Sequence, residues 1–252
     1  MTMAGPRHLG AQAKEHPDRP AVIMVGSGRV TTYRQLDERS NRLAHALRGA
    51  GLQVGDHLAL MMGNGSAFLE VAWAAQRAGL YYTALNGHLR RDEAQYILDD
   101  CGAVALVITA GLADVAVGLD LARVPLCIVS GGEVPGFTPY EEVLAQGSPQ
   151  PIVDEAEGRE MLYSSGTTGV PKGVRKPIGV TTPGDPRAPS VVIVEGIAAM
   201  GIDEGAVYLS PAPLYHSAPL VYSMAMHRLG SPRWSWSRSN QLPAWGRSSA
   251  TG

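Results

Sequence analysis

The densest group of residues that could do chemistry lies between positions 163 and 174, which read YSSGTTGVPKGV. Serine and threonine hydroxyls donate hydrogen bonds, and Lys172 adds a positive charge. Glycines let the backbone turn with positive φ and approach a ligand closely, so that successive N–H groups converge on an anion. The run therefore predicts a loop that holds phosphate.

Two widespread phosphate motifs do not fit this loop. The ATPase pattern GxxxxGK[ST] needs glycine before the lysine and serine or threonine after it, whereas Pro171 precedes Lys172 and Gly173 follows it. The dinucleotide pattern GxGxxG fails because position 164 is a serine. A polar hairpin without function is the remaining alternative, although such turns seldom carry an unbroken run of serine, threonine and glycine.

The elements that must position this loop alternate along the chain. Helical spacing of apolar residues, with Thr32 and Ser66 as expected caps, predicts helices that follow these two residues. Apolar runs without strict alternation predict strands at 20–25, 55–64, 80–86, 103–109 and 124–130. Strands separated by helices predict an α/β fold, doubly wound, with a mostly parallel sheet flanked by helices.

Composition excludes several classes of protein. The net charge of −2 gives no basic field for nucleic acid. No uninterrupted apolar run reaches the roughly 18 residues of a transmembrane helix, so we expect a cytoplasmic protein, with peripheral membrane contact left open. The two cysteines, Cys101 and Cys127, sit in apolar runs and lack the spacing of a metal site, so no side-chain metal site is expected.

The segment from Ser164 to Gly173 resembles the phosphate loop of the AMP-forming adenylating enzymes, the adenylate-forming (ANL) superfamily. That pattern reads [ST]-[SG]-G-[ST]-T-G-x-P-K-G, and the chain matches it throughout. The resemblance covers roughly residues 15–230 and includes PAPLYHSAPL, which places His216 at an aromatic-or-histidine position of an acyl-pocket motif. Asn86 and the following LRRDE are more similar to acyl-CoA synthetases of the fatty-acid–CoA ligase type than to peptide-synthetase domains.

The resemblance implies ATP-dependent activation of a carboxylic acid, with a fatty acid expected, to an acyl-adenylate and then to acyl-CoA. ATP, a fatty acid and CoA would be the small-molecule partners, and Mg²⁺ would bind mainly through phosphate oxygens. His216 would lie beside the acyl pocket, and aryl or amino acid substrates stay open. The residues expected to bind the β- and γ-phosphates are Ser164, Ser165, Gly166, Thr167, Thr168, Gly169 and Lys172.

The chain divides at residue 230 by this resemblance. Residues 1–230 are expected to form a partial N-terminal AMP-binding domain, whereas residues 231–252 are rich in serine, tryptophan and arginine and fit neither the helix nor the strand pattern. A genuine tail, a frameshifted segment and an engineered end are all open; if Ser235 and Ser237 use TCN codons, reading WSWS one base earlier gives Val-x-Val with an apolar x, which favours the frameshift.

Later motifs of the superfamily have no counterpart here, so the resemblance implies a chain that is inactive alone. A non-catalytic module that binds a nucleotide or a partner is the alternative function.

Overall fold

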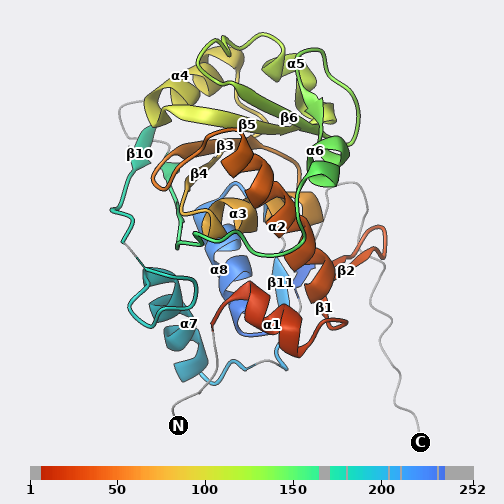
Figure 1. Cartoon of the computed structure of the whole chain (residues 1–252), viewed down its shortest axis with the longest axis vertical. Coiled ribbons are helices and arrows are strands. Elements are labelled where there is room, and N and C mark those ends of the chain that lie inside the picture. Colours follow the sequence, from red (N-terminus) through yellow and green to blue (C-terminus); the bar gives the residue numbers. More distant parts are fainter. Residues whose placement is uncertain are drawn as a thin grey trace, which may run out of the picture.

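The structure of the chain is a computed structural model that describes residues 7–164, 171–179, 181–203, 205–210, 212–231 and 233–235 (Figure 1). Within these ranges the strands form a six-stranded sheet, a four-stranded sheet and a two-stranded hairpin. Figure 1 shows helices α2 and α3 between the two larger sheets, and α4 and α5 on the opposite side of the six-stranded sheet.

The six-stranded sheet is parallel throughout, as each of its strand pairs shows. A parallel sheet needs crossover connections, and here most strands are separated by helices or long loops that run back across a face. The strands lie in the order β7 (Thr138–Pro139), β6 (Leu126–Ser130), β5 (Ala103–Thr109), β3 (His57–Met61), β4 (Tyr81–Ala84) and β8 (Arg159–Glu160).

Successive side chains of these strands enter two different cores, because strand residues alternate between faces. Leu58 and Leu60 of β3 join one core, and Ala59 and Met61 join the other. The first core packs against α2 (Tyr33–Gly49), α3 (Ser66–Arg77) and α6 (Tyr140–Gln146), and the second against α4 (Arg91–Cys101) and α5 (Ala113–Ala116), beside the short 3₁₀ helix η1 (Ala110–Leu112). Apolar residues on both faces confirm the predicted doubly wound α/β sheet.

The starts of the two long helices test the predicted caps. The Thr32 side chain accepts a hydrogen bond from Gln35 N, and the Gln35 side chain accepts one from Thr32 N, so the predicted cap of α2 is confirmed. The predicted cap of α3 is wrong. Ser66 is the first helical residue there, Gly65 occupies the capping position in extended conformation, and no side chain caps the helix.

The four-stranded sheet brings together elements from both ends of the chain. β1 and β2 form an antiparallel hairpin, and β12 lies between β1 and β11, parallel to both. β12 belongs to the 231–252 segment, where the pattern predicted no element; a domain boundary at 230 stays a prediction. The remaining elements are β1 (Pro20–Met24), β2 (Val30–Thr32), β11 (Tyr208–Ser210), β12 (Arg233–Ser235), α1 (Leu9–Glu15), α7 (Pro189–Ala199) and α8 (Ser217–Arg228).

The turn from α8 into β12 is bound to the N-terminal part of the chain. The Arg19 guanidinium donates to Gly230 O at 3.1 Å, and the Tyr33 hydroxyl donates to Ser231 O at 3.0 Å. Gly230 has φ of 79°, a conformation that favours glycine. None of the helices in the described ranges is long and apolar enough to cross a membrane.

Candidate functional site: a phosphate-type hairpin and a buried polar cavity

The predicted phosphate loop is carried by a short antiparallel hairpin at the carboxyl end of β8. Its stems are β9 (Leu162–Ser164) and β10 (Lys172–Val174), and Ser164 pairs directly with Lys172. Both residues are exposed at the base of the loop. The other predicted loop residues, namely Ser165, Gly166, Thr167, Thr168 and Gly169, lie outside the described residues.

The stem of the hairpin is fixed by contacts with α4 and within itself. The Tyr163 hydroxyl donates to the Asp100 carboxylate, and burial together with this bond raises the pKa of Tyr163 far above its usual value, so the phenol stays a donor. Gly173 pairs with Tyr163 across the hairpin. A Cβ at Gly173 would lie 2.6 Å from Met161 Cε and 2.8 Å from the Tyr163 ring, so only glycine fits without displacing them.

The chain that leaves β10 is held by the six-stranded sheet. The Tyr81 hydroxyl of β4 accepts from Ile178 N at 3.1 Å and donates to Lys176 O at 2.8 Å. The Arg175 guanidinium lies 4.9 Å from the centre of the Tyr81 ring, and His57 stacks on Tyr81 with ring centres 4.6 Å apart. Burial, and then the charge of Arg175, lower the pKa of His57. The hairpin is therefore anchored at both stems.

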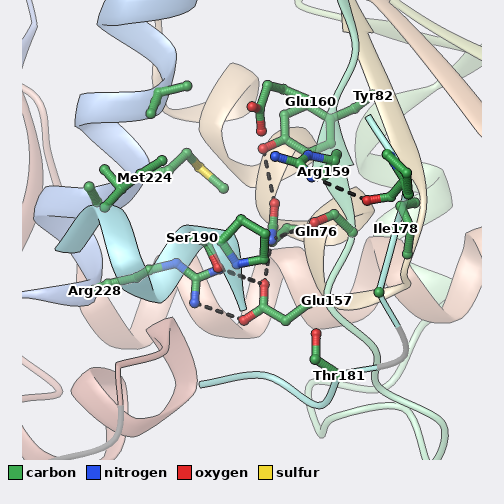
Figure 2. A pocket seen from close by; sticks show the side chains of 17 residues that line it. Gln76, Tyr82, Glu157, Arg159, Glu160, Ile178, Thr181, Ser190, Met224 and Arg228 are labelled. Carbon is green, nitrogen blue, oxygen red and sulfur yellow. Dashed lines mark hydrogen bonds and ion pairs between the residues drawn. The ribbon is translucent and has the colours of Figure 1, made fainter. Parts of the chain in front are cut away.

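A second polar group lies below the hairpin, where α3, α8 and the start of β8 meet (Figure 2). The Glu157 carboxylate receives two parallel bonds from Arg228, at 2.8 and 2.9 Å, and a further bond from the Gln76 amide. Gly184 N donates to the same carboxylate at 3.0 Å, and Ser190 at 3.3 Å. Since the Arg228 and Glu157 side chains are only 1% and 4% exposed, this is a buried ion pair with its hydrogen bonds satisfied.

This ion pair joins several elements into one unit. The Gln76 amide oxygen accepts from the Tyr82 hydroxyl at 3.0 Å, which connects the pair to β4. The Arg228 guanidinium also lies 5.0 Å from the centre of the Trp73 ring and donates to Arg7 O at 2.8 Å. Burial is the main reason that the pKa of Tyr82 is raised well above its usual value. The network thus fixes the C-terminal end of α8 against α3 and β4.

A cavity of about 50 Å³ opens beside this network and has room for a few water-sized groups but not for a fatty chain. Its walls come from residues 157–160, residues 177–179, α7 and one face of α8. Val221 and Met224 of α8 line it. Met224 also belongs to the hydrophobic core, together with Leu220 of the same helix.

His216 lies at the start of α8, away from this network. It occupies the capping position of the helix, is exposed, and has its ring 4.4 Å from that of Tyr215. It is not among the described residues that line the cavity. Its place beside an acyl pocket therefore stays a prediction.

Sequence reasoning missed four residues of this region. Arg228 and Gln76 carried a signal, because each is a polar residue at the end of a mostly apolar run, in MAMHRLG and VAWAAQRAG. Glu157 carried none, since it belongs to a stretch rich in glycine, proline and acids that resembles a surface connection. Asn64 carried none either; its side-chain oxygen accepts from Leu214 N at 2.8 Å, in the loop before His216.

The β9–β10 hairpin lies at the carboxyl edge of a parallel sheet, where ligands of open α/β sheets bind. The exposed Ser164 and Lys172 at its base suit the binding of an anion. The overall fold is that of the N-terminal domain of adenylate-forming enzymes. A long-chain-fatty-acid–CoA ligase from Archaeoglobus fulgidus aligns with a TM-score of 0.77 and 21% identity, over 94% of this chain and 49% of that one. At this level of identity the similarity shows the fold alone.

The sequence places the chain more narrowly. The family model described as AMP-binding enzyme matches residues 9–244, and the chain belongs to this family.

Two curated relatives illustrate the similarity. The fatty acid–acyl-carrier-protein ligase ScoC of Streptomyces coeruleorubidus is 34% identical over 163 residues, which cover 64% of this chain and 30% of that protein. The 3-oxocholest-4-en-26-oate–CoA ligase of Rhodococcus rhodochrous is 34% identical over 168 residues, with 63% and 30% covered. The chain thus spans about 30% of the length of these relatives.

Proposed function

We propose that this chain binds ATP through the β9–β10 hairpin and takes part in the activation of a carboxylic acid, a fatty acid being our first choice, to an acyl-adenylate and then to acyl-CoA. Family membership and the names of the two ligases support this proposal. The observation that carries it is the pairing of Ser164 with Lys172 at the base of the loop. Directly opposed residues of an antiparallel pair project from the same face, so the hydroxyl-bearing and ammonium-bearing side chains start from neighbouring positions near the carboxyl edge of the sheet.

Adenylation brings one anion against another. The carboxylate oxygen forms a bond to the α-phosphorus of ATP, the bond from that phosphorus to the bridging oxygen breaks, and pyrophosphate leaves. Positive charge and N–H donors placed on the β- and γ-phosphates reduce the repulsion and stabilise the leaving group. In our proposal Lys172 and the hydroxyl of Ser164 serve these phosphates, together with Ser165, Gly166, Thr167, Thr168 and Gly169.

Mg²⁺ would accompany the nucleotide. The described ranges hold no cluster of three or more histidine, cysteine or acidic residues. In our proposal the ion is carried mainly by phosphate oxygens, as is usual for Mg²⁺ at nucleotide sites, and neutralises phosphate charge. CoA would enter as the second substrate, in the cytoplasm, and its thiolate would displace AMP.

The binding step is tested by calorimetry with Mg-ATP and with AMP. We expect Lys172→Met to weaken ATP binding by about tenfold or more, because one charge-assisted contact with phosphate is lost. AMP lacks the β- and γ-phosphates, so its affinity should not change in this variant. Lys176→Met removes another exposed lysine, four positions away, and serves as the control. The proposal fails if the native chain shows no heat at millimolar ATP, or if Lys172→Met binds ATP as the native chain does.

The chemical step is tested by exchange of labelled pyrophosphate into ATP in the presence of fatty acids. Exchange that depends on the acid supports adenylation and overturns the expectation that the chain is inactive alone. ATP binding without exchange, by contrast, favours the non-catalytic nucleotide-binding module. Aryl and amino acids tested in parallel decide whether a fatty acid is the substrate.

A further inference from the structure

The loop that leads into α8 is held by a side chain from the other large sheet. Asn64 follows β3 of the six-stranded sheet, whereas residues 212–216 follow β11 of the four-stranded sheet. The Asn64 side-chain oxygen accepts from Leu214 N at 2.8 Å, and its amide nitrogen donates to Ala212 O at 3.4 Å. One amide group thus pairs with two backbone groups of the same loop.

These two bonds lie on either side of Pro213, which has no N–H to donate. The loop therefore has fewer donors with which to hold itself, and a side chain from outside supplies both a donor and an acceptor. Leu214 is fully buried in the core that contains α2 and α3, so its backbone cannot rely on water. Asn64 therefore helps to hold Leu214, and His216 follows two residues later, where its own N–H donates to Pro213 O at 3.2 Å.

Asn64 also relates this loop to the phosphate-type hairpin. β3 is parallel to β4, and β4 is parallel to β8, which leads into the hairpin. Asn64 and the hairpin therefore emerge from the same carboxyl edge of one sheet. The Asn64 bonds bring the start of α8, which belongs to the other sheet, to that edge.

We infer that Asn64 is a positioning residue that holds the His216 loop beside the nucleotide end of the site. In this position the loop would align the acyl group of a bound adenylate with its pocket. The inference rests on the proposed function and deepens it, because it assigns Asn64 to the acyl side and not to the phosphates. Loss of the amide should weaken binding of an acyl-adenylate while leaving ATP binding unchanged.

The test compares two ligands on the full chain by calorimetry: Mg-ATP and a non-hydrolysable decanoyl-sulfamoyl adenosine. We expect Asn64→Ala to lower the affinity for the acyl analogue by about tenfold, which is the scale of two lost hydrogen bonds. The affinity for ATP should stay within about twofold of the native value. Asn64→Asp keeps the acceptor for Leu214 N and should therefore lose less affinity for the acyl analogue than Asn64→Ala does. Asn86→Ala is the matched control, since Asn86 follows the adjacent strand β4 and its side chain accepts from His88 N, close by in its own loop.

Each outcome decides between the two proposals. If the native chain binds neither ligand, the proposed function fails, and the inference about Asn64 falls with it. If the native chain binds both and Asn64→Ala binds the analogue equally well, the function stands and the positioning role is overturned. An equal loss of affinity for both ligands in Asn64→Ala would show a general destabilisation of the fold. That result would also overturn the positioning role of Asn64.

Discussion

Replacing Glu157 by glutamine removes one charge of the buried ion pair with almost no change of shape. The Arg228 guanidinium then stays buried at 1% exposure without a counter-charge. Breaking a buried pair from one side costs about 3–5 kcal/mol of unfolding free energy. Because Arg228 keeps its bond to Arg7 O and its contact with the Trp73 ring, we expect a loss of about 3 kcal/mol, at the lower end of that range.

The assay is urea unfolding followed by intrinsic fluorescence, with the midpoint and the slope fitted separately. Glu160→Gln is the control, since it makes the same chemical change three residues further on, at a half-buried carboxylate that lines the same cavity. We expect this control to stay within about 0.5 kcal/mol of the native protein, as surface-type changes do.

A double variant, Glu157→Leu with Arg228→Met, separates the loss of charge balance from the loss of packing. Replacing both charges by apolar side chains is often neutral, so the double variant should be more stable than Glu157→Gln. It also keeps the reasoning testable if Glu157→Gln does not fold. A Glu157→Gln protein within about 1 kcal/mol of native stability, or a double variant less stable than it, would refute the argument from buried charge.

Two further predictions concern backbone space and pH. Gly158→Ala would place a Cβ 2.4 Å from Leu80 O, a backbone atom that cannot move without disturbing the β4–β8 pairing, so we expect a loss of about 2 kcal/mol or more, seen as a lowered Tm. No change in Tm would contradict this. The pKa of His8 is held well below its ordinary value, first by burial and then by two nearby arginines. Below about pH 6.5, His8 therefore becomes protonated in the unfolded chain but stays neutral in the native protein. The free energy of unfolding consequently falls as the pH drops, by up to about 1.4 kcal/mol per pH unit. His8→Asn keeps a capping side chain and should flatten this slope in urea titrations from pH 7.5 to 5.5; an unchanged slope would exclude His8 as its source.

The fold could be predicted because its signals are local. Apolar runs such as 103–109 fill a strand that is buried on both faces, and the Thr32 cap requires only residues within one helical turn. The failure at Ser66 has an equally local cause. Serine is a good cap only in the residue before the helix, and here Gly65 holds that place.

The polar network could not be predicted because its partners are distant in sequence. Glu157 belongs to a connection whose composition indicates a surface loop, and it is buried only because Arg228, 71 positions later, neutralises it. The two bonds of Asn64 join loops separated by about 150 positions. The hairpin signal, by contrast, lay in one contiguous run, and the strands β9 and β10 lie at the two ends of that run.

The place of β12 in the four-stranded sheet has a consequence for how the chain is made. Val22 pairs with Arg233, about 210 positions later, and β12 is the strand that lies between β1 and β11. Until the ribosome has released β12, the β1–β2 hairpin and β11 each keep a strand edge whose backbone N–H and C=O groups have no strand to pair with. Synthesis of this protein therefore passes through a long interval in which its earliest strands are open to pairing with other chains.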